Sequence, residues 1–326
     1  MAEVRLEAPE LTVVIPAYNE QESIVPMFER LVAALEQRVD GLEILFVDDG
    51  SRDATWQRVC ELASRDRRVR GVRFARNFGH QAALTAGVDA AAGRAVAIID
   101  ADLQDPPEVI PSMIDRWREG FEVVYGQREQ REGETAFKKA TAAAFYRLLR
   151  RITNVEIPVD TGDFRLMGPR AVAAFRSLPE RNRFIRGLVA WIGFPQTAVR
   201  YRRHPRQAGE TKYPLRKMVR FALDGITSFS FLPLRLATWL GFAVSVLSFL
   251  YIVVVMVLKL LGINWPGYTS MMASILFLGG VQLVMIGVLG EYVARIFDEV
   301  KRRPLYLVGE STDGSVGVTP PERHSS

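Results

Sequence analysis

Hydrophobic positions in the first half of the chain form short apolar runs, separated by longer stretches in which apolar residues recur at helical spacing. The runs are rich in β-branched residues and occupy positions 11–18, 42–49, 68–75, 94–102 and 121–128. The stretches between them are residues 21–37, 53–66, 80–91 and 107–120. Strands that alternate with helices predict an α/β fold, with a mostly parallel sheet covered by helices on both faces.

Two later segments have a different pattern. Residues 236–258 contain no charged side chain, and in residues 270–290 the most polar side chain is Gln282. Since about 20 apolar residues span a bilayer core, we predict transmembrane helices over residues 231–261 and 269–295, with a buried helical hairpin as the alternative. Residues 1–212 then form a cytoplasmic domain, residues 213–230 an amphipathic interfacial helix, and residues 296–326 a cytoplasmic tail. That tail is rich in Ser, Gly, Thr and Pro after Glu310, and we expect disorder there.

Basic residues flank both predicted spans on the same side. Arg216, Lys217, Arg220 and Arg235 precede the first span, and Arg295, Lys301, Arg302 and Arg303 follow the second. The positive-inside rule therefore places both termini in the cytoplasm, with Lys259 as a mild exception. The first ten residues contain no apolar stretch typical of a signal peptide. We expect a multi-pass protein of the inner (plasma) membrane.

Charge is unevenly distributed. The chain has 42 basic and 37 acidic residues, and residues 128–220 hold 21 of the basic but only 8 of the acidic ones. Such a block indicates an anionic partner (phosphates, nucleic acid or an acidic membrane surface), although a solvated basic face is the simpler alternative. Because the block adjoins the predicted spans and the strand ends are acidic, we expect no nucleic-acid partner.

Polar side chains follow the predicted strands at their carboxyl ends, where α/β sheets bind ligands. They are Asn19 with Glu20, Asp48 with Asp49, Arg76 with Asn77, and Asp100 with Asp102. On a continuing strand Asp100 and Asp102 would point to one face. Their oxygens suit Mg²⁺ or Mn²⁺, and surface polarity is the alternative.

Two further features concern this region. Asp105 precedes Pro106 and Pro107, so it is a candidate cap for the helix that follows. No Gly-x-Gly-x-x-Gly motif follows the first strand and no Walker lysine loop occurs, which argues against an ordinary dinucleotide or P-loop site.

Several motifs together carry a family resemblance. They are VVIPAYNE, VDDGSRDAT, ARNFGHQAALTAG, IDADLQDPPE, YGQR, TGDFRLM, PERNRFIRGLVAWIGF and EVKRRPLYLV. With the two spans, they make residues 11–307 resemble the inverting family 2 glycosyltransferases typified by dolichyl-phosphate mannose synthase. The chain is more similar still to bacterial polyprenyl-phosphate glycosyltransferases of the bactoprenol glucosyltransferase type.

The resemblance implies a GT-A nucleotide-sugar-binding domain and a role for individual residues. Asp100 and Asp102 would engage metal and diphosphate, with Gln104 beside them. Pro16, Tyr18 and Glu20, with Asp48 or Asp49, would bind the nucleotide. Asp163 matches the residue treated as catalytic, and we assign catalytic roles to Asp102 and Arg128 as well. Arg128 also matches a position expected to contact a phosphate. The acceptor phosphate is expected to contact Arg202, Arg203 and Lys212.

The role of Asp163 is open at this point. A lipid phosphate is largely ionised near neutral pH, so a strong base is scarcely required. Asp163 would take a last proton, orient the acceptor or hold the donor sugar. The alternative is a turn aspartate after Gly162 that bonds its own backbone. Arg165, two residues along, is its expected nearest partner and would keep it ionised.

The function implied is inverting, metal-dependent transfer of a hexose from a nucleotide sugar to polyprenyl (undecaprenyl) phosphate at the cytoplasmic membrane face. Glucose from UDP-glucose is the first choice, Mg²⁺ or Mn²⁺ the cofactor, and a homo-oligomer the expected state. Open alternatives are GDP-mannose, UDP-galactose or UDP-N-acetylglucosamine as donor. A processive synthase is disfavoured, because two spans are too few for a channel and no Gln-x-x-Arg-Trp motif occurs. A membrane scaffold with a degenerate nucleotide-binding domain is the non-enzymatic alternative.

Overall fold

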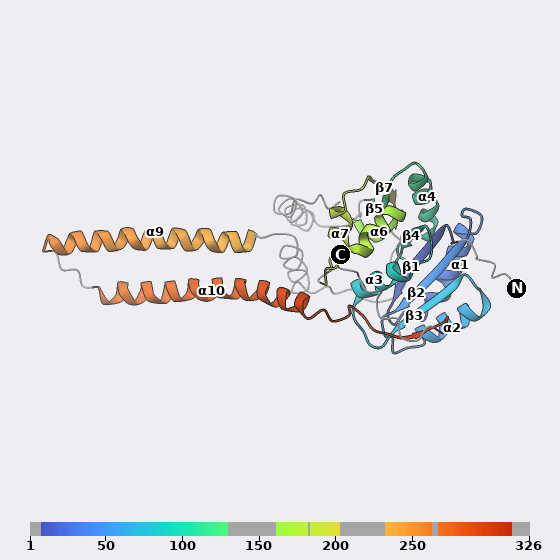
Figure 1. Cartoon of the computed structure of the whole chain (residues 1–326), viewed down its shortest axis with the longest axis horizontal. Helices are drawn as coiled ribbons and strands as arrows, with labels where there is room; N and C mark the ends of the chain where they lie inside the picture. Colours follow the sequence, from blue (N-terminus) through green and yellow to red (C-terminus); the bar gives the residue numbers. More distant parts are fainter. Residues whose placement is uncertain (1–7, 130–160, 182, 203–231, 263–266, 315–326) are drawn as a thin grey trace. The chain divides into compact units, whose positions relative to one another are not determined.

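A twisted mixed sheet organises the first part of the protein. The computed structural model describes residues 8–129, 161–181, 183–202, 232–262 and 267–314. These divide into two units, one containing residues 1–213 with 303–326 and the other residues 214–302 (Figure 1).

Within the described residues the sheet has eight strands in the order β7-β5-β6-β4-β1-β2-β3-β8. Their bounds are β1 Leu11–Ala17, β2 Leu42–Asp48, β3 Val69–Phe74, β4 Ala95–Ile98, β5 Val123–Arg128, β6 Thr161–Met167, β7 Gln196–Tyr201 and β8 Val308–Ser311. The four neighbours β4, β1, β2 and β3 pair in parallel, as do β5 and β7. Only β6 and β8 run antiparallel to their neighbours. The predicted mostly parallel sheet is confirmed.

Helices cover both faces of the sheet. Strands β1 and β2 are accordingly buried along their whole length, on both faces. One face carries α1 Ile24–Leu35, α2 Thr55–Arg65 and α4 Ile110–Arg118, the last preceded by the 3₁₀ turn η1 Pro107–Val109. The other carries α3 His80–Ala90, followed by α6 Pro169–Ser177 and α7 Ile185–Trp191. In α3, Gly87 packs directly on Val14 of β1, where a Cβ atom would collide with the valine side chain. These helices agree with the predicted α/β alternation.

The spacing of buried residues explains why these segments are helices and strands. In α1 the buried positions are Ile24, Met27, Leu31 and Leu35, which share one side of the helix. They pack on alternate residues of β1, from Leu11 to Ala17. The core therefore lies between β1 and α1, directly beneath the carboxyl ends of the central strands.

The last described segment of the chain belongs to this sheet. Strand β8 pairs antiparallel with β3, and residues 303–326 group with the first unit. This differs from the sequence-based assignment of residues 296–326 to a cytoplasmic tail with disorder after Glu310, since Ser311 pairs with Val72 of β3 and the Thr312 amide donates to the Gly71 carbonyl. The cause is β3 itself, whose outer edge offers backbone groups that a returning segment can pair with.

The second unit contains two long apolar helices, α9 Leu232–Leu260 and α10 Tyr268–Val300. Both have exposed apolar surfaces, and the segments Leu234–Leu260 and Ser270–Val300 are long and apolar enough to cross a membrane. The second helix continues five residues beyond the predicted end at residue 295. The helices contact each other, with Gly241 facing Met285. The predicted interfacial helix, residues 213–230, lies outside the described residues.

Candidate functional site

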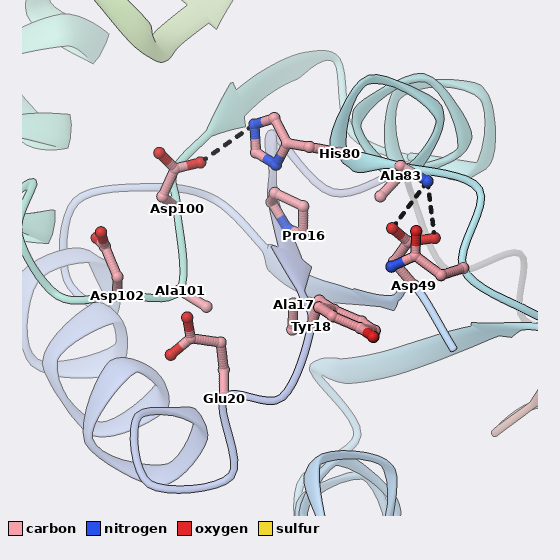
Figure 2. Close-up of a pocket in the computed structure, with 12 residues that line it drawn as sticks. Pro16, Ala17, Tyr18, Glu20, Asp49, His80, Ala83, Asp100, Ala101 and Asp102 are labelled. Carbon is pink, nitrogen blue, oxygen red and sulfur yellow. Dashed lines mark hydrogen bonds and ion pairs between the residues drawn. The ribbon is translucent and has the colours of Figure 1, made fainter. Parts of the chain in front are cut away.

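A pocket of about 320 Å³ opens at the carboxyl ends of β1, β2 and β4. This is the edge at which parallel α/β sheets bind ligands. Its lining includes six of the residues to which the family resemblance assigns a role, as well as Asn77 from the polar strand ends, and Figure 2 labels ten of the twelve. The lining residues are Pro16, Ala17, Tyr18, Glu20, Asp49, Asn77, Gly79, His80, Ala83, Asp100, Ala101 and Asp102.

Asp100 and Asp102 both line this pocket, although not by strand alternation. Strand β4 ends at Ile98, and the two aspartates lie in the turn that follows. Asp100 Oδ1 is buried, accepts no hydrogen bond from any described residue and lies 3.6 Å from Nε2 of His80. Burial, together with nearby carboxylates, raises the pKa of Asp100 to about 6 despite the opposing effect of His80. Burial thus disfavours the ionised form of Asp100 more than His80 favours it.

A divalent cation fits this edge. Oxygen ligands suit Mg²⁺ and Mn²⁺, and Asp100 presents a buried oxygen that no hydrogen bond occupies. Among the described residues, no three His, Cys, Asp or Glu side chains gather to hold an ion by themselves. Mg²⁺ is usually bound through one or two carboxylates and completed by substrate phosphates, so a pair of aspartates is a sufficient protein contribution. Asp100 and Asp102 are therefore the candidate protein ligands.

The loop after β1 also lines the pocket, through Tyr18 and Glu20. Asn19 has a left-handed backbone conformation, with φ of 56°, and its backbone N–H donates to Ser51 Oγ at 2.9 Å. The Glu20 amide donates to Thr55 Oγ1 at 2.8 Å. These bonds leave Tyr18 42% exposed at the pocket, where its ring can stack on a base. Figure 2 shows the carboxylate of Glu20 on the side of the pocket that carries Asp102.

Asp48 and Asp49, which end β2, have separate environments. Asp49 lines the pocket, and its carboxylate accepts hydrogen bonds from the backbone amides of Phe78 and Gly79 at 2.6 and 2.9 Å. Asp48 is fully buried and outside the pocket lining, with its Oδ1 accepting from the Ser51 amide. Of the two acids predicted for the nucleotide, the structure brings only Asp49 to the pocket.

Asp163 lies in β6 and is held by three basic side chains. Arg186 Nε donates to Asp163 Oδ1 at 2.9 Å, and His80 Nε2 lies 3.3 Å from Oδ2. Arg165, the expected nearest partner, is farther away at 3.7 Å, so that expectation is wrong. Arg165 instead donates to the backbone carbonyls of residues 162 and 163. The turn-aspartate alternative for Asp163 is also wrong, because the residue is within a strand.

Electrostatics keep Asp163 ionised. Burial alone would raise its pKa, but the hydrogen bond with His80 and the Arg186 and Arg165 guanidinium groups bring the pKa far below the usual range. Desolvation would lower the pKa of His80, yet Asp163 and Asp100 raise it above its ordinary value. His80 thereby joins Asp163 to the Asp100 edge of the pocket.

The reasoning from sequence missed His80 and Arg186. Both lie within motifs quoted for the resemblance, ARNFGHQAALTAG and PERNRFIRGLVAWIGF. His80 begins α3 directly after the polar end of β3, a position that could have identified it. Arg186 lies in α7, and its approach to β6 depends on tertiary packing, for which the sequence carries no local signal.

Arg128 is part of a buried cluster with Asp105 and Tyr201. The Tyr201 hydroxyl donates to Asp105 Oδ1 at 2.6 Å, and Arg128 Nε donates to that hydroxyl at 3.3 Å. Arg128 Nη2 lies 3.7 Å from Asp105 Oδ2. The predicted capping role of Asp105 is wrong, because Pro106 occupies the cap position of η1 without a side-chain bond. Asp105 is instead fully buried as the partner of Tyr201.

Two of the remaining predicted residues, Gln104 and Arg202, are described and lie outside the pocket lining. Gln104 is buried, and its backbone N–H donates to Asp102 Oδ1 at 3.1 Å. Arg202 has a 91% exposed side chain that pairs with Glu129 at 3.0 Å. Arg203 and Lys212 lie outside the described residues. The acceptor-phosphate assignments thus stay predictions.

Comparisons with known proteins cover both units. Residues 12–174 match the model for Glycosyl transferase family 2, and residues 232–296 match the GtrB C-terminal hairpin. The uncharacterized glycosyltransferase YkcC of Bacillus subtilis (strain 168) is 50% identical over 301 residues, or 92% of this chain and 93% of that protein. The SfII prophage-derived bactoprenol glucosyl transferase of Shigella flexneri is 44% identical over 308 residues, or 94% and 99%.

Among solved structures, glucosyl-3-phosphoglycerate synthase from Mycobacterium tuberculosis, in complex with phosphoglyceric acid, is similar with a TM-score of 0.47. Its identity is 21%, over 68% of this chain and 79% of that one.

Proposed function

Because this chain belongs to glycosyl transferase family 2, we propose that it transfers glucose from UDP-glucose to a polyprenyl phosphate, with inversion at the sugar. Glycosyltransferase activity itself follows from the family and from relatives of 44% identity or more over at least nine-tenths of the chain. The sugar and the lipid come from the name of the Shigella flexneri relative, a bactoprenol glucosyl transferase. The nucleotide, the metal and the stereochemistry are parts of the proposal.

The acidic edge of the pocket carries the proposal. Asp100 presents a buried oxygen that accepts no hydrogen bond from a described residue and lies 3.6 Å from His80 Nε2, beside Asp102, where a sugar nucleotide would place its diphosphate. Tyr18 and Asp49 would then contact the base and ribose. Asp100 and Asp102 would hold Mg²⁺ or Mn²⁺, which when bound neutralises the diphosphate and the departing phosphate.

The reaction is a single displacement. An oxygen of the acceptor phosphate attacks the anomeric carbon, the bond from that carbon to the β-phosphate oxygen of UDP breaks, and UDP leaves with the electron pair. One displacement inverts the configuration. Since a phosphate monoester has a second pKa of about 6, the attacking oxygen is largely ionised at neutral pH.

Asp163 is a poor base in this arrangement, because its pKa lies far below the usual range. Of the three roles open from the sequence, taking a proton therefore fits least, and the contacts of Asp163 support a fourth role, the positioning of two basic side chains. Asp163 fixes Arg186 and His80 through bonds of 2.9 and 3.3 Å, and His80 lines the pocket. Arg128 would meet a phosphate from the Asp105 cluster, and Arg202, Arg203 and Lys212 would bind the acceptor phosphate.

The acceptor is a membrane lipid, and the two apolar helices suit a membrane protein. We place the enzyme in the inner membrane, with the sheet unit and both termini on the cytoplasmic side, where nucleotide sugars are made. The basic block of residues 128–220 would then contact the acceptor phosphate and anionic headgroups.

A thermal-shift screen tests the donor. The full-length protein in detergent is heated with UDP-glucose, UDP-galactose, UDP-N-acetylglucosamine or GDP-mannose, each with Mn²⁺ or with EDTA. A ligand at 100 times its dissociation constant stabilises the native state by about 2.7 kcal/mol. We expect the largest shift with UDP-glucose and Mn²⁺, and its loss in Asp102→Asn but not in the surface control Asp115→Asn. An equal shift in EDTA would contradict metal-dependent binding of the donor. A larger shift with GDP-mannose would contradict UDP-glucose as the donor.

A further inference from the structure

The chain after α10 returns to the sheet and is anchored there at several points. The Ala75 amide donates to the Leu307 carbonyl at 2.9 Å, and the Thr312 amide donates to the Gly71 carbonyl at 3.0 Å. Just before β8, the buried Tyr306 stacks on Phe74 with ring centroids 5.1 Å apart. The connection from the end of α10 to the start of β8 is residues 301–307 alone.

Glu310, in the middle of β8, has both carboxylate oxygens bonded to the sheet unit. Oε1 accepts a hydrogen bond from Arg73 Nη1 at 2.8 Å, and Oε2 accepts one from the indole of Trp56 at 2.9 Å. The two donors come from β3 and α2. The carboxylate therefore fixes the position of the Arg73 guanidinium from the outer edge of the sheet.

Arg73 extends this contact to the end of β2. Its Nε lies 3.3 Å from Asp48 Oδ2, and its Nη2 donates to the Ser51 carbonyl at 3.1 Å. Asp48 Oδ1 accepts from the Ser51 amide at 2.9 Å. One arginine thus joins Glu310 of β8 to the buried acid and the backbone of the loop that follows β2.

That loop supports the pocket on two sides. Ser51 Oγ accepts the hydrogen bond of the Asn19 amide, and Asn19 lies between two lining residues, Tyr18 and Glu20. Gly50 has φ of 69°, and a Cβ on it would lie 2.6 Å from the Arg76 carbonyl carbon. The loop is therefore packed against the segment that carries Asn77, another lining residue.

We propose that Glu310 is a positioning residue for the donor site. Through Arg73 it sets the loop after β2, which in turn holds the backbone on which Tyr18 and Glu20 stand. The segment that follows α10, including β8, then contributes to nucleotide binding through Glu310. This inference rests on the proposed function, since it assigns the residue to the binding of the nucleotide sugar.

Isothermal titration of the full-length protein in detergent with UDP-glucose and Mn²⁺ tests the proposal. Glu310→Ala, the length-preserving Glu310→Gln, and Arg73→Lys are compared with wild type. The matched control is Asp313→Asn, which removes the 3.3 Å contact of the same segment with Arg70, away from the loop after β2. Because the Glu310 side chain is half exposed, we expect donor affinity to weaken about three- to tenfold in Glu310→Ala. In the transfer assay the donor KM should rise by the same factor, with kcat within about twofold of wild type.

The outcomes separate this inference from the proposed function. Wild-type affinity in Glu310→Ala overturns the inference alone, as does equal weakening in Asp313→Asn, which would show general loosening of the segment. Should Glu310→Ala not fold, wild-type affinity in Glu310→Gln and Arg73→Lys together overturns it. If the wild-type protein binds no UDP-glucose, the proposed donor fails and the inference fails with it.

Discussion

Replacing Asp163 with Asn removes a buried negative charge and leaves its basic partners in place. The Asp163 and Arg165 side chains are 6% and 5% exposed, so solvent screens their interaction little. Arg186, at 2.9 Å, and His80, at 3.3 Å, also lose their interaction with this carboxylate. Removing one partner of a buried ion pair costs about 3–5 kcal/mol. For a domain of this size each 1 kcal/mol lowers the melting temperature by roughly 2–4 °C, so we expect a fall of roughly 6–20 °C.

The effect has a defined pH dependence. The pKa of Asp163 in the folded protein is far below its usual value, so its stabilising contribution is present above the unfolded pKa of about 3.9. That contribution decreases as the pH falls below this value, because protons then bind the unfolded state preferentially. The difference between wild type and Asp163→Asn should therefore be largest between about pH 6 and pH 5, where both His80 and Asp163 are charged. It should decrease as the pH rises through the raised pKa of His80, which Asp163 helps to raise, and it should shrink again below about pH 4.

Melting of the full-length protein in detergent, followed by near-ultraviolet circular dichroism, measures this difference. The matched control is Asp115→Asn, whose ion pair with Arg38 is half exposed on both sides. We expect the control to stay within about 4 °C of wild type, since such surface pairs contribute about 1 kcal/mol or less. A fall in Asp163→Asn no larger than in the control would refute the reasoning about the buried cluster.

Three other predictions concern the support of Arg128, the acceptor and the topology. Tyr201→Phe removes the hydroxyl between Arg128 and buried Asp105, so the melting temperature should fall by about 3–12 °C and turnover should drop. An unchanged melting temperature would contradict a stabilising role of this hydroxyl. Arg202→Ala, Arg203→Ala and Lys212→Ala should raise the KM for lipid phosphate with donor affinity retained. Wild-type kinetics in all three on a soluble short-chain prenyl phosphate would leave them only a membrane-anchoring role. A tag at Asn264 should face away from the cytoplasm and a tag at either terminus toward it; protease protection of the Asn264 tag in whole cells, with labelling of the termini from outside, contradicts this.

The periodicity of the sequence predicts the part of the fold that depends on local pattern. Strands β1 and β2 and helix α1 match their predicted segments closely because continuous or periodic burial is visible in the residues themselves. Strand β8 was not predicted, since its four residues, Val308–Ser311, carry only one large apolar side chain. Its position depends on β3 and on contacts such as that of Glu310 with Trp56, more than 250 residues away in the chain.

The candidate site divides in the same way. Asp100, Asp102 and Glu20 could be identified because they follow apolar strands, and strand ends converge at one edge of a parallel sheet. Asp105 was misassigned because its partner, Tyr201, is 96 residues away, whereas a cap is a local feature. The pattern of apolar and polar residues along the chain does not show which side chains of distant elements pair.

Transfer of labelled glucose from UDP-glucose to undecaprenyl phosphate tests the central claim most directly. The purified full-length protein is incubated with both substrates and Mn²⁺, and the lipid is extracted with organic solvent and counted. We predict a labelled glycolipid with the β configuration, opposite to the α-linked donor, and loss of label in EDTA and in Asp102→Asn. An α-linked product would contradict the single displacement. Undiminished labelling in EDTA and in Asp102→Asn would contradict a diphosphate held through the acidic edge of the pocket.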